Sequence, residues 1–386
     1  MKSSKKKLAL FYPWIKSKGG SEKVILEILK SRKYDVDIYT WVYEPEHSFE
    51  DFKKFKINVI APKFLKKLGK SKILRGLFFP ASIFSKIPLE KYDSFLIYTA
   101  GVGELIVFKN HKRGRTYIYS NTPLRYASKE IVKWNLKNIY KNPFSKIIYL
   151  LSVKIYNFFE RMAWKKIDRA IFISEVSRKR AIEKNLTGEN LSKIVYPPVN
   201  FQNQKKGKSE RGEYFLYLSR FNAPKRQDLL IKAWEVFSKK YPKENLVLAG
   251  HIENKKYFEK IKKLAKRSEN VLIKPNLSDK EKQELYTKCK AVIFVPFKED
   301  FGIVPFEALA FGKPVIGVDE GGYVELIRDH PQFFKIKELH SQEKMVEEIN
   351  RCLENFLKSK SHPQKKIVFN KITSRNFIKE LEKILE

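Results

Sequence analysis

Two separate runs of alternating strand-like and helix-like segments dominate this sequence of 386 residues. The first run begins with an apolar segment at 7–12, passes through the pair Gly19-Gly20 and an amphipathic segment at 24–29, and returns to a strand-like segment at 36–40. A strand, a glycine turn, a helix and a second strand form the βαβ unit of a parallel sheet. The pattern therefore predicts a doubly wound α/β domain at the start of the chain.

A second alternation follows a change in composition at residues 196–213, where two prolines precede a mostly polar stretch that is typical of a linker. Strand-like runs lie at 214–219, 245–249, 271–274, 291–295 and 314–318, with helical patterns at 228–239, 257–267, 279–288 and 305–311. We therefore expect an α/β protein with two Rossmann-like doubly wound domains, residues 1–200 and 201–365. A C-terminal helix within 366–386 is expected to pack back on the first domain. Ligands in such sheets bind beyond the carboxyl ends of the strands, so the site should lie where the two domains face each other across a cleft.

Composition excludes some classes of protein and leaves the meaning of the charge open. The hydrophobic share of 43% excludes a disordered chain, and two cysteines exclude a disulfide scaffold. The 79 Lys and Arg residues against 43 Asp and Glu give a net charge of +36, which favours polyanionic partners. However, Lys greatly outnumbers Arg, the preferred residue for recognising phosphates and bases. A general bias toward Lys explains the charge equally well.

The sequence offers little to target the chain into a membrane. Its longest apolar stretch, residues 147–153, is far shorter than the roughly 20 residues that span a bilayer. We expect a cytoplasmic protein, soluble or peripheral at the inner face of the cell membrane. Residues 63–79 are basic and apolar, so they could bind an anionic membrane surface or simply cover the N-terminal sheet. A second basic and aromatic segment, 133–166, is predicted to supply core and hinge helices.

The most informative segment follows the strand predicted at 291–295. Glu299 leaves the carboxyl end of that strand, Gly302 permits a close approach of the backbone, and Pro305 suits the first turn of a helix. The free amide groups of such a turn favour an anion. Glu307 is predicted in the same turn, where it could cap amides or accept hydrogen bonds from the hydroxyl groups of a sugar.

This segment resembles the E-x7-E region of the family-4 retaining glycosyltransferases of the GT-B fold, in a branch that contains many mannosyltransferases. Glu299 and Glu307 occupy the two Glu positions of that motif. The resemblance implies transfer of a hexose from a nucleotide-diphosphate sugar, GDP-mannose first and a UDP-sugar next, to a glycan or lipid-linked acceptor. It assigns the acceptor to residues 1–200 and the nucleotide-sugar to residues 201–365. It also implies no cofactor and no metal, because Lys and Arg can replace a divalent ion.

The resemblance also implies roles for individual residues. Arg220 and Lys225 follow a predicted strand, so both could converge on the donor diphosphate. Glu307 would bind the ribose, and Glu299 the hexose. The backbone segments that resemble donor- or acceptor-binding loops are Gly19-Gly20, Phe301-Gly302-Ile303 and Gly321-Gly322.

One position departs from the pattern of this family. Asn121 occupies a place where many relatives have a histidine that is thought to contact the transferred hexose. Asn can form hydrogen bonds but does not titrate near neutral pH. A catalytically weak GT-B homologue that acts as a binding subunit is therefore one alternative. A nucleic-acid-binding protein is another, but the sequence contains no recognised nucleic-acid motif, and we expect no nucleic-acid partner.

Overall fold

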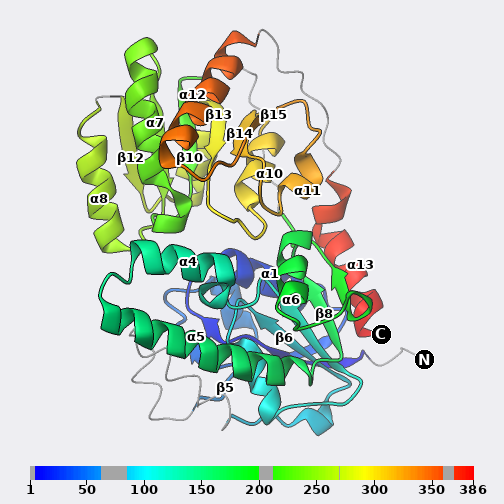
Figure 1. The fold of residues 1–386 in the computed structure, drawn as a ribbon. Coiled ribbons are helices and arrows are strands. Elements are labelled where there is room, and N and C mark those ends of the chain that lie inside the picture. The colour runs from blue at the N-terminus through cyan, green and yellow to red at the C-terminus, as the bar shows by residue number, and fades with distance from the viewer. Residues whose placement is uncertain (1–4, 62–84, 200–211, 269, 360–368) are drawn as a thin grey trace. The chain divides into compact units, whose positions relative to one another are not determined.

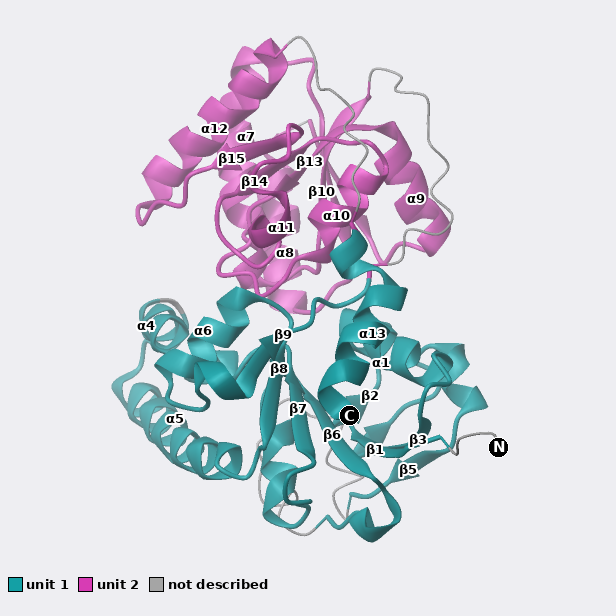
Figure 2. Cartoon of the chain, turned by 90° about the vertical axis from the view of Figure 1, so that its right-hand side faces the viewer, with its two compact units in different colours: residues 1–198, 370–386 teal, residues 199–369 magenta. Residues whose placement is uncertain are grey.

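The computed structural model describes residues 5–61, 85–199, 212–268, 270–359 and 369–386. The chain divides into two compact units, one formed by residues 1–198 together with 370–386 and the other by residues 199–369 (Figure 2). Residues 63–79, the basic and apolar segment that could bind a membrane or cover the N-terminal sheet, lie outside the described residues. No helix in the described ranges is long and apolar enough to cross a membrane.

The first unit contains a seven-stranded parallel sheet in the order β5-β3-β1-β6-β7-β8-β9 (Figure 1). Its strands are β1 (Lys7–Phe11), β3 (Asp35–Thr40), β5 (Ile57–Val59), β6 (Ser94–Thr99), β7 (Thr116–Ser120), β8 (Arg169–Phe172) and β9 (Ser192–Ile194). Its α-helices are α1 (Gly20–Lys30), α4 (Lys129–Asn138), α5 (Pro143–Trp164), α6 (Glu175–Glu183) and α13 (Ser374–Leu385). The C-terminal helix α13 contacts α1, and Phe377 packs edge-to-face on Tyr119 of β7.

The second unit contains a six-stranded parallel sheet in the order β12-β11-β10-β13-β14-β15. Its strands are β10 (Tyr214–Leu218), β11 (Leu246–Gly250), β12 (Val271–Pro275), β13 (Cys289–Phe294), β14 (Val315–Val318) and β15 (Phe333–Ile336). Its α-helices are α7 (Gln227–Lys240), α8 (Lys255–Ala265), α9 (Asp279–Lys288), α10 (Ile303–Ala310), α11 (Val324–Ile327) and α12 (Gln342–Lys358). The predicted α/β fold class with two doubly wound sheets is confirmed.

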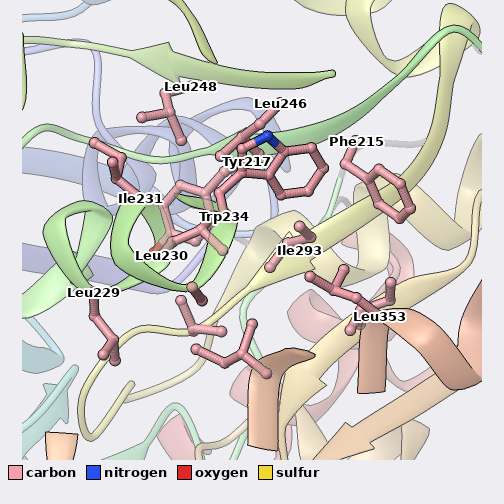
Figure 3. Close-up of a cluster of buried hydrophobic side chains, with 14 of the residues drawn as sticks. Phe215, Tyr217, Leu229, Leu230, Ile231, Trp234, Leu246, Leu248, Ile293 and Leu353 are labelled. Atoms are coloured by element: carbon pink, nitrogen blue, oxygen red, sulfur yellow. The ribbon is translucent and has the colours of Figure 1, made fainter. Parts of the chain in front are cut away.

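Apolar residues of the second unit pack between the sheet and the helices α7 and α12. Trp234 of α7 lies fully buried against Phe215 of β10, and Leu353 of α12 belongs to the same cluster (Figure 3). Central strands such as β13 are buried along most of their length because both faces of a parallel sheet are covered. Because these apolar strands are packed on both faces, the loops that follow their carboxyl ends begin at well-defined positions.

The order of the strands reverses once in each sheet. In the second unit the chain builds β10, β11 and β12 in one direction and then returns to place β13 on the other side of β10. In the first unit the same reversal separates β1 from β6. The loops after the two strands at such a reversal diverge to opposite faces of the sheet, which leaves a crevice where ligands bind in this class of fold.

Helices α4 and α5 correct one expectation from the sequence. The segment 133–166 does form helices, but α5 is not a simple core helix. One face, with Tyr149, Tyr156 and Trp164, is buried, whereas much of the opposite face is apolar and exposed. The prediction of core and hinge helices did not include this exposed apolar face, because a sequence does not show which of two apolar faces packs against the protein.

A buried polar cluster anchors α5 to the loop that follows β6. The Tyr156 hydroxyl donates to the Glu104 carboxylate and lies 3.3 Å from a Glu160 oxygen, while Lys184 forms an ion pair with Glu160. The amide of Leu124 also donates to Glu160, over 3.4 Å. The cluster thus ties α5 and α6 to the loops after β6 and β7.

Burial raises the pKa of Glu160 from its ordinary value of 4.5 to about 7, even though Lys184 opposes this shift. Burial also raises the pKa of Glu104. A raised folded-state pKa means that the folded protein binds more protons than the unfolded chain between pH 4.5 and about 7. The contribution of Glu160 to stability is therefore greatest below pH 4.5 and falls as the pH rises through this window.

We predict that Glu160→Gln reduces the pH dependence of the free energy of unfolding between pH 4.5 and 7, since Gln cannot titrate. The change in slope should be at most about 1.4 kcal/mol per pH unit. Urea denaturation at a series of pH values measures it, with the exposed Glu183→Gln of α6 as the control. Equal slopes for the wild type and Glu160→Gln would contradict the prediction.

Candidate functional site

Lys225 and Glu299 meet at the reversal of strand order in the second unit. Lys225 lies in the loop after β10, and Glu299 in the loop after the neighbouring strand β13. The Lys225 Nζ lies 2.5 Å from the Glu299 Oε2, and the two side chains are 12% and 15% exposed. Both charged groups are largely shielded from solvent. Their direct ion pair therefore holds the two side chains in this position.

Further contacts hold these two loops together. The amide of Phe297 donates to the carbonyl of Pro224 over 2.8 Å. The guanidinium of Arg226 lies 4.6 Å from the centre of the Phe297 ring and forms two hydrogen bonds with Glu338, of 2.8 and 2.9 Å. Lys225 therefore lies next to a residue, Arg226, that is held in place by stacking and by a bidentate ion pair.

Two glycines allow the backbone to close around Glu299. Gly302 has φ +82° and Gly321 has φ +117°, conformations that strain residues with a side chain. A Cβ at Gly321 would lie 3.1 Å from the carbonyl oxygen of Glu299. The amide of Gly322 donates to this same oxygen over 3.3 Å. The loop at Gly321-Gly322 thus packs closely against the backbone of Glu299 and forms a hydrogen bond with it.

The position of Glu307 corrects the prediction that it lies in the first turn of its helix. Helix α10 begins at Ile303, directly after the left-handed Gly302, so Pro305 lies in the first turn and Glu307 is the fifth residue. Glu307 accepts hydrogen bonds from Lys282 over 2.6 Å and from the Tyr286 hydroxyl over 2.7 Å. Burial raises the pKa of Tyr286, which keeps its hydroxyl protonated as a donor. Both partners come from α9.

Arg220 does not contact the carboxylate that Lys225 holds. Its guanidinium lies 3.0 Å from Glu253, and both side chains are well exposed. The ring of Phe301 is buried and stacks on Phe306, so only its backbone can take part in a site. The structure thus brings together Lys225, Glu299 and the loops of Gly302 and Gly321.

Cations at this end of the second unit are matched by carboxylates. Five ion pairs join residues of these loops and adjacent segments: Arg220–Glu253, Lys225–Glu299, Arg226–Glu338, Lys282–Glu307 and Lys298–Glu320. Within the described ranges, no group of three or more His, Cys, Asp and Glu side chains is arranged to hold a metal ion.

The first unit carries a smaller polar cluster at its own strand reversal. Gly19 precedes α1 and Gly20 begins it, as the strand-glycine-helix pattern predicted. The Asn121 Nδ2 donates to the Ser21 hydroxyl, and the Asn121 Oδ1 accepts from the Tyr98 hydroxyl, each over 2.8 Å. Asn121 therefore links the ends of β6 and β7 to the first turn of α1.

Glu22 lies beside this cluster and is almost fully buried. It accepts a hydrogen bond from the Ser17 hydroxyl over 2.7 Å, and burial raises its pKa. A Cβ on Gly19 would lie 2.7 Å from a Glu22 oxygen, so a side chain at this position would displace the Glu22 carboxylate.

Several partners in these clusters were not found from the sequence. Lys282 and Tyr286 lie on the helix predicted at 279–288, but their approach to Glu307 depends on how α9 packs. Arg226 follows Lys225 directly and carried no signal beyond its charge. The contact of Ser21 with Asn121 joins residues 100 positions apart, a distance that one sequence cannot reveal.

Comparisons with known proteins agree with this architecture. Residues 199–367 match the family model described as glycosyl transferases group 1. The chain is 24% identical over 377 residues to the alpha-1,3/1,6-mannosyltransferase ALG2 of Kluyveromyces lactis, covering 84% of this chain and 72% of the relative. It is 25% identical over 347 residues to human ALG2, covering 81% and 79% of the two chains.

Solved structures show the same fold. Anabaena Alr3699/HepE, in complex with UDP and glucose, superposes with a TM-score of 0.67 at 17% identity, covering 98% of this chain and 99% of the other. WaaG, a glycosyltransferase involved in lipopolysaccharide biosynthesis, superposes with a TM-score of 0.61 at 19% identity, covering 90% of each chain. The chain therefore has the GT-B fold of these glycosyltransferases, and its residues 199–367 match the group 1 glycosyl transferase family.

Proposed function

We propose that this protein is a retaining hexosyltransferase that binds a nucleotide-diphosphate sugar in its second unit and transfers the hexose to a glycan or lipid-linked acceptor. The observation that carries the proposal is the Lys225–Glu299 pair at the reversal of strand order. GDP-mannose is the first candidate donor, because the relatives include mannosyltransferases. UDP-sugars come second, in line with the UDP complex of the Anabaena protein.

Lys225 is suited to hold the diphosphate without releasing Glu299. A lysine ammonium group has three donors, and one of them already serves Glu299. The remaining donors can meet phosphate oxygens, whose negative charge grows as the bond to the sugar breaks. An ammonium group fixed in advance stabilises that charge best at the transition state.

Arg220 joins the diphosphate by exchanging its present partner. Its pair with Glu253 is exposed, with the Arg220 side chain 61% accessible, and such surface pairs contribute only about 0–1 kcal/mol. Guanidinium binds phosphate in a bidentate manner, which compensates for the loss of Glu253. The free amides at the start of α10 add partial positive charge on the same side.

The remaining residues position the sugar and the ribose. Glu299 accepts hydrogen bonds from the hexose hydroxyls beside the amides of Phe301, Gly302 and Ile303. Glu307 accepts hydrogen bonds from the ribose hydroxyls, held for this role by two donors from α9. Gly321 and Gly322 keep the backbone close to the donor.

The chemistry requires no protein base. The acceptor hydroxyl oxygen bonds to C1 of the hexose on the face that the diphosphate leaves, and its proton passes to an oxygen of the departing diphosphate. The first unit binds the acceptor near Gly19, Gly20 and Asn121. Lys225 and Arg220 supply the positive charge that a metal would otherwise provide.

We place the protein in the cytoplasm, at the inner face of the cell membrane when its acceptor is lipid-linked.

A catalytically weak homologue that binds sugar is the second candidate, favoured by Asn121 in place of the family histidine. The polar atoms of Asn121 already contact Tyr98 and Ser21, which suits a structural link as well as a substrate contact. A transfer and hydrolysis assay across GDP- and UDP-sugars separates the two candidates.

We expect this assay to give transfer with GDP-mannose or a UDP-hexose and a product that keeps the anomeric configuration of the donor. EDTA-treated protein should retain its activity, because no metal takes part. Donor binding with neither transfer nor hydrolysis would favour the binding subunit. Loss of activity in EDTA, restored by Mn²⁺ or Mg²⁺, would refute the metal-independent mechanism.

We predict that Lys225→Ala and Arg220→Ala each lower turnover by about 10²–10³-fold, because each removes a cation from the transition state. Lys240→Ala is the matched control, since Lys240 also forms an ion pair in the second unit, with Glu354 between α7 and α12. Steady-state kinetics with the donor found in the screen measure all three. Near-full activity of both Lys225→Ala and Arg220→Ala would refute the phosphate site.

A further inference from the structure

Helix α5 presents an exposed apolar stripe along its whole length. Apart from the adjacent pair Ile147-Ile148, successive members of the stripe lie three or four residues apart, from the first turn of the helix to the last. They are Phe144, Ile147, Ile148, Leu151, Ile155, Phe158 and Met162, with exposed fractions from 43% to 72%. At about 100° per residue, they fall within an arc of about 100° on a helix about 33 Å long. Soluble proteins rarely expose such a continuous apolar surface without a partner.

The fold of the first unit does not require this stripe. Helix α5 packs through its other face, where Tyr149, Tyr156, Ala163 and Trp164 are buried. That face contacts the 3₁₀ turns Gly103–Phe108 and Arg125–Ala127. Figure 1 shows α5 crossing in front of its unit, and the view turned by 90° in Figure 2 shows the helix along an outer edge of that unit. The stripe is therefore a second apolar face, opposite the one that stabilises the protein.

Positive charge borders the stripe on one side. The segment 133–166 contains eight basic residues: Lys133, Lys137, Lys141, Lys146, Lys154, Arg161, Lys165 and Lys166. Its one acidic residue, Glu160, is fully buried and paired with Lys184. On the helix, Lys154 and Arg161 border one edge of the stripe, and both are exposed. An apolar face with a basic border is the pattern of helices that lie in the surface of an anionic membrane.

We propose that α5 is a membrane-docking helix that lies in the interface of an anionic lipid bilayer, with its exposed stripe among the acyl chains and its basic residues at the headgroups. A second copy of this chain is a poorer occupant. A symmetric contact through α5 would bring two copies of the same basic border together, without carboxylates on this helix face to compensate. The inference does not rest on the sugar chemistry, because docking requires no donor.

Flotation of the full chain with vesicles tests the proposal. We expect binding to vesicles of phosphatidylcholine mixed with phosphatidylglycerol, weak binding to phosphatidylcholine alone, and release by salt. Ile147→Ser/Leu151→Ser/Phe158→Ser should weaken binding by about tenfold or more, because it removes apolar surface from the bilayer. The matched control, Leu191→Ser/Val236→Ser/Leu272→Ser, removes apolar residues of similar exposure elsewhere on the surface and should bind as the wild type does.

A labelled variant keeps the test informative if the triple substitution impairs folding. Cys289 and Cys352 are buried, so Leu151→Cys adds one accessible thiol for an environment-sensitive dye. Anionic vesicles should shift its emission to the blue, whereas the same dye on Leu272→Cys should not respond. Equal flotation of the two triple variants, or no dye response at position 151, would overturn the proposal. A different pair of results would also overturn the proposal: the wild type is a dimer by light scattering and binds no vesicles, and the α5 triple variant is a monomer.

Discussion

The ion pair between Lys225 and Glu299 is the interaction around which the second unit organises its site. It joins the loops that leave β10 and β13, the two neighbouring strands between which the order of the sheet reverses. Elsewhere in a doubly wound sheet, helices cover the loops after the strands, but at this reversal the loops separate and leave space for a ligand. A buried lysine with one carboxylate partner can still offer donors to a phosphate.

The supporting contacts explain why this pair keeps its geometry. Arg226 stacks on Phe297 and is fixed by Glu338, which holds the Lys225 loop against the Glu299 loop. Gly302 and Gly321 adopt backbone conformations that bring the chain close to Glu299. Catalytic groups held by such second contacts lose little freedom when substrate binds.

The first unit uses the same strand order for a different set of groups. At its reversal, Asn121 joins Ser21 and Tyr98 through neutral hydrogen bonds rather than through an ion pair between the strand ends. In the function proposed here, neutral hydrogen-bonding groups suit a sugar acceptor, whereas the charged end of the second unit suits a diphosphate. The two units thus share a fold and differ in the chemistry placed at the same topological position.

Much of the fold could be predicted because buried strands in parallel sheets are continuous apolar runs. Those at 214–219 and 291–295 proved to be β10 and β13 within one or two residues. Glu307 was placed one turn too early, because the left-handed Gly302 lets α10 begin before Pro305. The exposed apolar face of α5 was not predicted, because apolar spacing alone does not show which side of a helix is covered. The partners of Lys225 and Arg220 depend on contacts between distant segments, which charge and spacing did not reveal.

The central claim is that Lys225 holds the diphosphate of the donor, and it can be tested by comparing nucleoside diphosphates with monophosphates. Titration calorimetry with GDP, GMP, UDP and UMP gives the affinity ratio for each base. For the wild type, the preferred diphosphate should bind at least about tenfold more tightly than its monophosphate, as expected of charge-assisted hydrogen bonds. In Lys225→Ala this ratio should fall several-fold, leaving the part that Arg220 and the amides of α10 supply, while the monophosphate affinity stays unchanged. An unchanged ratio in Lys225→Ala would contradict the account.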